Sequence, residues 1–299
     1  MAMEQVIGID LGGTAIKLGR FNRAGECLQS LTVDTPQPPT PEAVLAKFVD
    51  AIAHLDPGHQ TLAIGIGTPG PTDVTGRIAT IAINLKDWIN VPMAEWLEAK
   101  CDRPVMMAND ANCAGLGEAW IGAGADFNDI ILLTLGTGVG GAIILNGQLF
   151  TGHQGTAGEL GLITFHPDGP DCNSGNNGSL EQYLSVQAIR RRTGMEPKEL
   201  GEKALAGDER AIAFWQEYGR DLGTGLASLL YVLTPEAVII GGGVSASSDL
   251  FLPSAWDEIQ RRVLPTSRPN LHIVTASLGN QAGMVGAAKL AWQHLTSFR

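Results

Sequence analysis

Residues 6–21 have the sequence VIGIDLGGTAIKLGRF, and this stretch decides which fold the chain is expected to adopt. Apolar residues run or alternate on both sides of Gly12-Gly13, which predicts antiparallel strands at 6–11 and 15–21 joined by a glycine turn. A third alternating run occupies residues 27–33. We therefore expect a β-meander in the first part of the chain.

The same pattern occurs a second time near the middle of the chain. An apolar run at 129–135 ends in glycines, 139–145 supplies its partner strand, and Asn146-Gly147 predicts a hairpin turn before a short strand at 148–151. Such an internal repeat predicts two similar α/β domains that face each other across a cleft. Ligand sites would then lie between the two domains.

Helical and strand patterns alternate through the rest of the chain. Apolar residues at helical spacing predict a helix around 44–52 and a long buried helix from Asp208, its N-cap, to about residue 229. Further elements are expected as strands at 61–67, 105–108, 238–240 and 271–276, and as a small-residue helix at 281–295.

The composition excludes several classes of protein. A formal charge of −11 over 299 residues repels nucleic acid and anionic lipid, and no apolar run is long enough to span a bilayer. The residues MAMEQ at 1–5 carry an acidic residue where a secretion signal would be basic. The four cysteines lack C-x-x-C spacing, which is typical of reduced thiols. We expect a cytoplasmic protein with neither redox chemistry nor nucleic-acid or membrane partners.

Two glycine turns at corresponding positions of the repeat predict a phosphate site. They are Asp10-Leu-Gly-Gly-Thr14 and Leu135-Gly-Thr-Gly138. Glycine lets backbone N–H groups approach an anion closely, so two such turns can hold a polyphosphate, and Asp10 could hold a hydrated magnesium ion. Either turn alone fits a plain hairpin equally well. The glycines lead into strands and no Walker sequence occurs, which disfavours a dinucleotide or P-loop site.

Asp110 is the candidate catalytic residue. It follows the predicted strand 105–108 and precedes a small-residue helix, where a carboxylate can accept a hydroxyl proton in phosphoryl transfer. From the residues alone, the simpler alternative is that Asp110 only caps the helix. The polar side chains of Asn84, Glu159 and Glu181 suit sugar hydroxyls, although each also fits a turn, a solvated loop or a helix start.

Seven motifs in order resemble the ROK family of bacterial sugar kinases. They are Asp10-Leu-Gly-Gly-Thr-Ala-Ile-Lys17, Gly67-Thr-Pro-Gly70, Asn84-Leu-Lys-Asp-Trp88, Asn109-Asp-Ala-Asn112, Leu135-Gly-Thr-Gly138, Ala157-Gly-Glu159 and Gly241-Gly-Gly-Val-Ser245. The resemblance implies an α/β protein of the actin-like ATPase (ribonuclease H-like) fold. Its small domain would span residues 1–109 and include the returning helix 281–299, and its large domain would span 110–280. The resemblance further implies a homodimeric, glucokinase-like enzyme that phosphorylates the 6-hydroxyl of a hexose.

The same resemblance assigns roles to individual residues. Asp110 would be the general base, and the sugar would be contacted by Gly70, Asn84, Asn109, Asp110, Glu159 and Glu181. ATP would be held by Asp10, Gly12, Gly13, Thr14, Lys17, Gly136, Thr137, Gly138, Gly241, Gly242 and Gly243, with Asp10 acting through water on Mg²⁺.

The sequence departs from the family where many members bind structural zinc through one His and three Cys. The corresponding positions here are Leu162, Cys172, Ser174 and Ser179. One thiol cannot build a tetrahedral zinc site, and His166 and Asp171 are improbable substitutes, so we predict no zinc. The missing His also contacts the sugar in zinc-containing relatives. Leu162 therefore leaves glucose, mannose, fructose and N-acetylhexosamine open as substrates.

Three other functions compete with an ATP-dependent kinase. Repressors of the family carry an N-terminal helix-turn-helix domain, whereas the first strand here is expected near residue 5. A sugar-binding protein without catalysis would be favoured had Asp110 or the glycine turns been replaced, and they are intact. Polyphosphate could replace ATP as donor, although the acidic composition argues weakly against a polyanion track.

Overall fold

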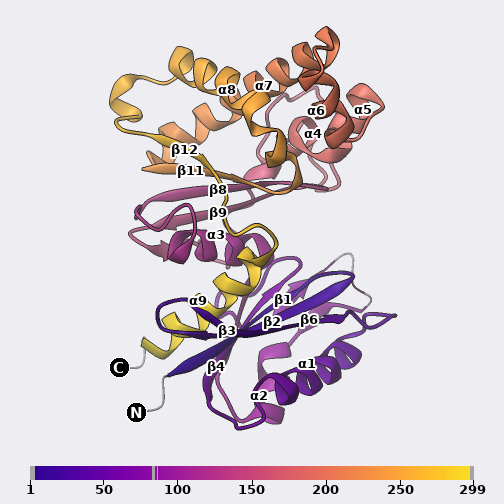
Figure 1. Cartoon of the computed structure of the whole chain (residues 1–299), viewed down its shortest axis with the longest axis vertical. Helices are drawn as coiled ribbons and strands as arrows, with labels where there is room; N and C mark the ends of the chain where they lie inside the picture. The colour runs from indigo at the N-terminus through magenta and orange to yellow at the C-terminus, as the bar shows by residue number, and fades with distance from the viewer. Residues whose placement is uncertain (1–3, 83–84, 86, 297–299) are drawn as a thin grey trace. The chain divides into compact units, whose positions relative to one another are not determined.

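The computed structural model describes residues 4–82, 85 and 87–296, and the chain divides into two compact units (Figure 1). Unit 1 comprises Met1–Asp126, Gln148–Gly158 and Asn280–Arg299, and unit 2 comprises Phe127–Gly147 and Glu159–Gly279. Both units are of the α/β class, as the repeated strand pattern predicts.

A five-stranded sheet forms the centre of unit 1. Its order is β3-β2-β1-β4-β7, with bounds Cys27–Asp34, Ala15–Asn22, Gln5–Leu11, Thr61–Thr68 and Val105–Asn109. The first three strands are antiparallel, which confirms the predicted β-meander, while β4 and β7 continue the sheet in parallel pairing. A small hairpin of β5 (Ala79–Ile81) and β6 (Ile89–Val91) lies outside this sheet.

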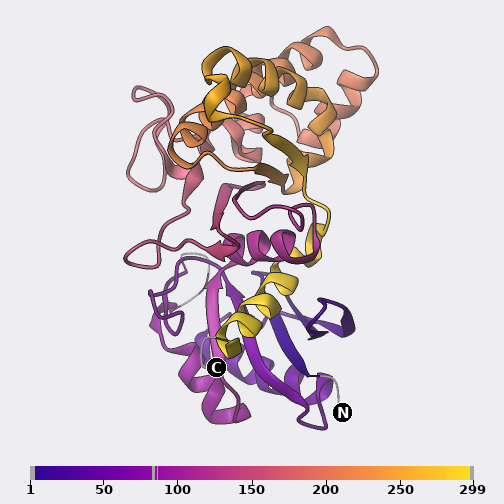
Figure 2. The same ribbon diagram turned by 90° about the vertical axis from the view of Figure 1, so that its left-hand side faces the viewer.

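Helices cover both faces of this sheet. Figure 1 shows α1 (Pro41–Leu55) and α2 (Met93–Cys101) on one face, and both views show α9 (Ala282–Thr296) against the strands on the other (Figure 2). Helix α3 (Asp110–Ile121) packs on α9 so closely that a Cβ atom on Gly286 would stand 1.6 Å from the Cys113 carbonyl oxygen. Because of this packing, the predicted domain boundary between residues 109 and 110 falls inside unit 1, which continues to Asp126.

Unit 2 repeats the sheet with a different cover of helices. The second five-stranded sheet has the order β10-β9-β8-β11-β12, with bounds Gln148–Leu149, Val139–Leu145, Ile130–Leu135, Ala237–Gly241 and His272–Thr275. Unit 2 contains β9, β8, β11 and β12, while the short edge strand β10 belongs to a segment of unit 1. The α-helices of unit 2 are α4 (Glu181–Leu184), α5 (Val186–Thr193), α6 (Pro197–Leu205), α7 (Glu209–Leu233) and α8 (Ser248–Arg262). Short 3₁₀ helices span Leu160–Leu162, Gly243–Ser247, Pro265–Ser267 and Gly279–Gln281. The last predicted strand of the repeat is shorter than expected, since β10 ends at Leu149.

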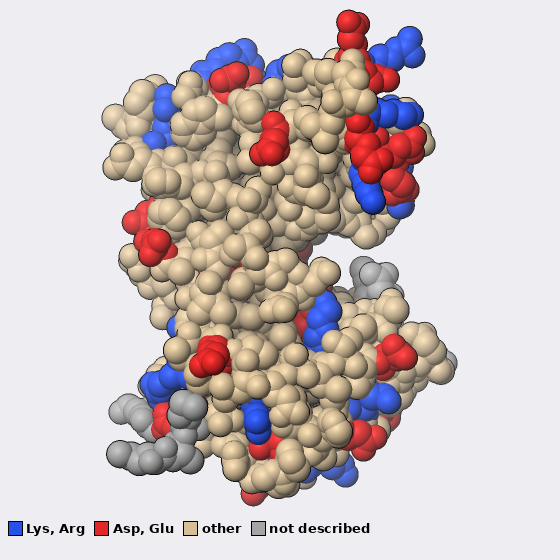
Figure 3. All heavy atoms as spheres, viewed as in Figure 1, with Lys and Arg blue, Asp and Glu red and all other residues tan. Residues whose placement is uncertain are grey.

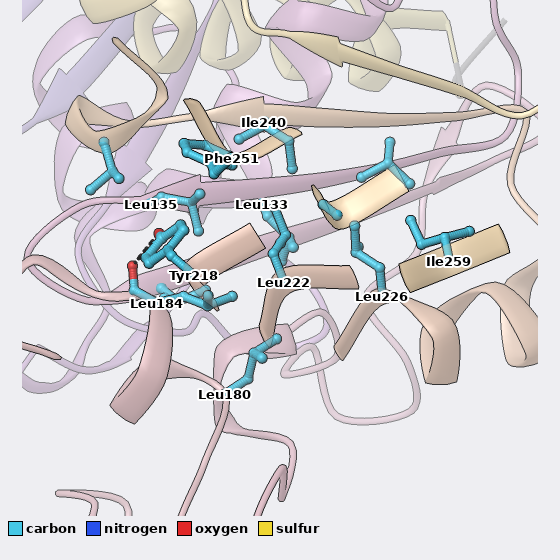
Figure 4. Close-up of a cluster of buried hydrophobic side chains, with 14 of the residues drawn as sticks. Leu133, Leu135, Leu180, Leu184, Tyr218, Leu222, Leu226, Ile240, Phe251 and Ile259 are labelled. Carbon is cyan, nitrogen blue, oxygen red and sulfur yellow. Dashed lines mark hydrogen bonds between the residues drawn. The ribbon is translucent and has the colours of Figure 1, made fainter. Parts of the chain in front are cut away.

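Helix α7 supplies much of the core of unit 2. Asp208 caps it as predicted, because its carboxylate accepts hydrogen bonds from the Arg210 and Ala211 N–H groups. Figure 4 shows Tyr218, Leu222 and Leu226 of this helix facing the strand residues Leu133, Leu135 and Ile240 and the α8 residues Phe251 and Ile259. The buried apolar stripe therefore holds the helices against the strands that end at the glycine turns.

The surface agrees with an acidic protein of mixed charge. On the face shown in Figure 3, Lys and Arg side chains lie among Asp and Glu side chains, most densely over α5 and α6. Within the described part of the chain, no helix is both long and apolar enough to cross a membrane. The four cysteines are free thiols, and Cys27 is exposed while the other three are buried.

Candidate active site

Asp10 and Lys17 face each other across the first hairpin of unit 1. They are paired in register on β1 and β2, and Lys17 Nζ lies 3.6 Å from Asp10 Oδ2. Lys17 Nζ also donates to the Asn280 carbonyl oxygen at 3.0 Å, just before α9. Burial raises the pKa of the Asp10 carboxyl, and the positive charge of Lys17 lowers it in part. The pair places a carboxylate and an ammonium group next to the first glycine turn.

The first glycine turn is held by hydrogen bonds to its own backbone. Gly12 N donates to the Ala15 carbonyl oxygen at 3.0 Å, Thr35 Oγ1 donates to the Gly12 carbonyl oxygen at 2.7 Å, and Thr35 N donates to Thr14 O at 2.9 Å. Gly13 is exposed, and a Cβ atom there would meet nothing within 4 Å. The turn is thus fixed at its base and open at its tip. Thr35 was not identified from the sequence, because a Thr at the end of a strand carries no distinctive pattern.

Asn109 and Asp110 lie where β7 ends and α3 begins. Asn109 is the N-cap, since its Oδ1 accepts from Ala111 N at 2.9 Å and from Asn112 N at 3.4 Å, and its Nδ2 donates to the Gly70 carbonyl oxygen at 3.2 Å. Asn109 is therefore the N-cap residue of α3, and Asp110, considered as the cap from the sequence, shares the Ala111 N–H with it at 2.8 Å. Gly70, which adopts φ +78°, and Asn109 are brought together as the resemblance implies.

The Asp110 carboxyl has an unusual electrostatic environment. Part of the residue stays open to solvent, but protein atoms surround the carboxyl group and this burial raises its pKa. A hydrogen bond from Ala111 N, 2.8 Å from Asp110 Oδ1, lowers the pKa, and the negative charge of Asp10 raises it. The fully buried Cys113 thiol lies near both carboxylates, and burial raises its pKa well above the usual value, so it stays uncharged.

In unit 2, Glu181 contacts the second glycine turn directly. Its Oε2 accepts from Val139 N at 2.9 Å, and a Cβ atom on Gly138 would stand 2.4 Å from that oxygen. Gly136 N donates to the Gly138 carbonyl oxygen at 2.9 Å, and Gly136 O accepts from Val186 N at 2.8 Å. Glycine is therefore needed at position 138 so that the carboxylate can approach the turn. A predicted sugar residue and a predicted ATP turn are coupled here, which their separation in sequence does not reveal.

The third glycine segment, Gly241–Gly243, lies beside the second turn. Gly242 adopts φ +83°, and a Cβ atom there would stand 2.3 Å from the Leu135 carbonyl oxygen, the residue that precedes Gly136. Gly243 is exposed, and a Cβ atom on it would meet nothing within 4 Å. Unit 2 thus brings together two of the three glycine segments predicted to bind ATP, with Thr137 between Gly136 and Gly138.

The residues predicted to contact the sugar lie in both units, and one of them lies outside the described residues. Glu159 lies in unit 2 and precedes the 3₁₀ helix Leu160–Leu162, whose Leu162 N donates to the Glu159 carbonyl oxygen at 3.0 Å. Asn109, Asp110 and Gly70 lie in unit 1. Asn84 falls outside the residues that the structure describes.

The four positions that correspond to zinc ligands in other family members do not offer a zinc donor set. Leu162 has no donor atom, and Ser174 and Ser179 have neutral hydroxyls, so Cys172 is the one thiol. Among the described residues, no group of three or more His, Cys, Asp or Glu side chains could hold a metal ion. Burial raises the pKa of the Cys172 thiol, but a hydrogen bond from Ser174 and the nearby Ser179 hydroxyl bring it below the usual value.

The chain is similar to known proteins over nearly its whole length. The sequence model of the ROK family matches residues 6–294. The glucokinase of Thermotoga maritima is 33% identical over 310 residues, which cover 97% of this chain and 98% of the relative.

Two solved structures are similar in fold and sequence. A ROK family glucokinase from Streptomyces griseus in complex with glucose and AMPPNP has a TM-score of 0.79 and 36% identity, over 97% of this chain and 99% of that one. A ROK hexokinase from Thermus thermophilus has a TM-score of 0.87 and 32% identity, over 98% of this chain and 99% of that one.

Proposed function

This chain belongs to the ROK family and is an ATP-dependent hexose kinase, and we propose that it transfers the γ-phosphoryl group of ATP to the 6-hydroxyl group of glucose. Its similarity to ROK glucokinase structures gives it the actin-like ATPase fold. The observation that carries the proposal lies in unit 1, where Asn109 is the N-cap of α3 and the Asp110 carboxyl, which also accepts from Ala111 N, has a pKa raised by burial and by the charge of Asp10. Asp110 is therefore suited to accept a proton.

In the proposed step Asp110 is the general base. The sugar 6-hydroxyl oxygen forms a bond to the γ-phosphorus, the bond from that phosphorus to the bridging oxygen breaks, and ADP leaves. The hydroxyl proton passes to the Asp110 carboxylate. A carboxyl pKa raised by burial and by the Asp10 charge makes Asp110 a stronger base than an ordinary aspartate, which supports this role.

We propose that Asp10 holds Mg²⁺ through water. Its side chain is 19% exposed beside the open turn Gly12–Gly13, and carboxylate oxygen is a ligand type that Mg²⁺ prefers. When bound, the ion would neutralise charge on the phosphate groups. The backbone N–H groups of the three glycine segments and the ammonium group of Lys17 would bind the phosphates.

Glucose is proposed as the sugar because of the glucokinase relatives. Gly70, Asn84, Asn109, Glu159 and Glu181 would contact its hydroxyls. Leu162 stands where a His makes a polar contact to the sugar in zinc-containing members. A hexose that needs a hydrogen-bond partner at this position would therefore bind less tightly than one that does not. Mannose, fructose and N-acetylhexosamine are the competing substrates.

The test is release of ADP by the purified protein with magnesium and ATP, against a panel of hexoses. We expect the highest kcat/KM on glucose, in the presence or absence of a zinc chelator. Higher kcat/KM on another hexose would overturn glucose as the sugar. Formation of the sugar phosphate with polyphosphate in place of ATP, measured directly because this donor releases no ADP, would reveal a second donor. Sugar binding without turnover would contradict the kinase itself.

We further propose that the enzyme is a cytoplasmic homodimer, as the resemblance to the family implies. Sedimentation equilibrium on the purified chain of 31.5 kDa would report twice that mass for a dimer. Fractionation of the native cells would place the activity with the soluble proteins. A monomer mass across micromolar concentrations would contradict the dimer.

A further inference from the structure

The loop at residues 162–181 of unit 2 joins two candidate sugar residues. It begins at the 3₁₀ helix that follows Glu159 and ends at Glu181, the first residue of α4. Its two ends are paired, since Leu180 N donates to the Ile163 carbonyl oxygen at 2.9 Å and Thr164 forms a β-bridge with Ser179. The position of this loop therefore sets the position of both glutamates.

The zinc positions of this loop are occupied by a small hydrogen-bonded cluster. Ser174 Oγ lies 3.3 Å from the Cys172 sulfur. The Ser179 hydroxyl is fully buried and makes no hydrogen bond of ordinary geometry, but it lies near enough to this sulfur to lower the pKa of the thiol. These residues thus keep the spacing of a metal site without its ligands.

Asn176 connects three parts of the same loop. Its Nδ2 donates to the Leu162 carbonyl oxygen at 3.2 Å and to Thr164 Oγ1 at 3.0 Å. The backbone carbonyl oxygen of Asn176 accepts from Cys172 N at 2.8 Å, so the residue whose side chain bonds to the paired ends is also part of the tip that contains Cys172. Leu162 and Cys172 are two of the positions that a zinc ion would join, and Asn176 bonds to the backbone of both.

We propose that Asn176 is a positioning residue whose side-chain hydrogen bonds hold this loop together. It fixes the Leu162 end of the loop, which follows Glu159, and the tip that precedes Glu181. Glu181 in turn accepts from Val139 N beside the second glycine turn. Asn176 thereby acts on sugar binding through the two glutamates, and this part of the inference rests on the proposed function.

The other asparagines of the loop do not make the contacts that Asn176 makes. Asn177 Nδ2 donates to Asp171 Oδ1 at 2.7 Å, and both residues are exposed at the tip. Asn173 is likewise exposed. Asn176 is half-buried, and its bonds reach the end of the loop that leads back to Glu159.

The decisive variant is Asn176→Asp, which keeps the shape of the side chain but replaces the donating Nδ2 by an oxygen that repels the Leu162 carbonyl. Asn173→Asp makes the same change of charge at an exposed position of the loop and is the matched control. Thr164→Val removes the hydroxyl that Asn176 contacts and provides a second, uncharged test.

We expect Asn176→Asp to raise the KM for glucose roughly tenfold while the KM for ATP and kcat change less than about twofold. Thr164→Val should move the KM for glucose in the same direction by less, and Asn173→Asp should match the unchanged protein. Amide hydrogen exchange of residues 162–181 should become faster in Asn176→Asp but not in Asn173→Asp. Metal analysis should find less than one zinc per ten chains.

Unchanged exchange and unchanged KM for glucose in Asn176→Asp would overturn the proposal. So would one zinc per chain whose removal by a chelator accelerates exchange of the loop. The exchange and metal measurements need no enzyme activity, so they decide the role of Asn176 even if the protein phosphorylates no hexose, which would contradict only the proposed function.

Discussion

The carboxyl groups of Asp10 and Asp110 lie near enough to each other in unit 1 that the charge of Asp10 raises the pKa of Asp110. Asp10 is the last residue but one of β1, next to a glycine turn, and Asp110 begins α3. The negative charge of Asp10 makes the ionised form of Asp110 less favourable. The pair thus links the proposed ATP side of unit 1 to the proposed base.

Replacing Asp110 by Asn should abolish most of the turnover. The amide keeps the shape of the side chain but accepts no proton, so kcat should fall by about 10²- to 10⁴-fold, the range for loss of a general base. The affinity for glucose, measured by calorimetry without ATP, should stay within about threefold, because an amide still forms hydrogen bonds.

Asp50→Asn, an exposed change on α1, is the control for that experiment and should leave kcat unchanged. A kcat of Asp110→Asn above one tenth of the original value would remove Asp110 from the role of base.

The same pKa shift predicts a gain of stability in Asp110→Asn. The pKa of Asp110 is higher in the folded chain than the ordinary value of 3.8, so the folded state binds the proton more tightly and loses stability as the pH rises through this range. At neutral pH the variant should therefore unfold at a higher temperature, and the difference should shrink as the pH falls toward 3.8. Calorimetric scans at several pH values would check this, and a lower unfolding temperature at neutral pH would contradict it.

The acid limb of the pH profile should report the same group. Because catalysis needs the ionised carboxylate, kcat/KM for glucose should begin to fall at a pH above 3.8 as the pH is lowered. In Asp10→Asn one cause of the raised pKa is removed, so the Asp110 carboxyl should titrate at lower pH, which carbon NMR of the carboxyl group can measure. If the pKa of Asp110 is unchanged in this variant, the charge of Asp10 does not affect the ionisation of Asp110.

Lys17→Met should weaken the binding of ATP. The side chain keeps its length but loses the charge next to Asp10, and with it the bond to the Asn280 carbonyl oxygen. Loss of a charged hydrogen bond to phosphate should raise the KM for ATP by about 10- to 100-fold and leave the KM for glucose nearly unchanged. Lys100→Met, on the exposed side of α2, is the matched control. Equal increases in the KM for ATP and the KM for glucose would indicate that the substitution distorts the sheet of unit 1 and does not remove a phosphate contact alone.

Much of this frame could be predicted because it depends on local patterns. Alternating apolar residues and glycine turns gave the strands of both sheets, and the pairing of Asp10 with Lys17 follows from a hairpin whose turn is short. Asp208 was identified as an N-cap because it precedes a helical apolar stripe.

The rest depends on contacts between distant segments. Helix α3 belongs to unit 1, where it packs closely on α9 at Gly286. Small residues at helical spacing predict close packing but do not identify the neighbouring helix. Asn176 lies in a loop without apolar periodicity, so its bonds to Leu162 and Thr164 had no signal in the sequence. The Glu181 contact with Val139 N joins residues 42 apart and is equally invisible to local patterns.

Tyr218→Phe tests whether the core of unit 2 supports Glu181. The buried Tyr218 hydroxyl donates to the Leu184 carbonyl oxygen at 2.7 Å, drawn as a dashed line in Figure 4, and Leu184 ends the short helix α4 that begins with Glu181. Phe would leave this carbonyl buried without its partner, so the free energy of unfolding should fall by about 1–3 kcal/mol. The KM for glucose should rise, because α4 is released at its far end.

Tyr231→Phe is the matched control. It also removes a bond to a carbonyl oxygen, but Tyr231 is exposed and water replaces the lost partner, so the free energy of unfolding should change by no more than about 0.5 kcal/mol. Equal loss of stability in both variants would show that burial does not set the cost, and an unchanged KM in Tyr218→Phe would show that α4 keeps Glu181 in place without the core.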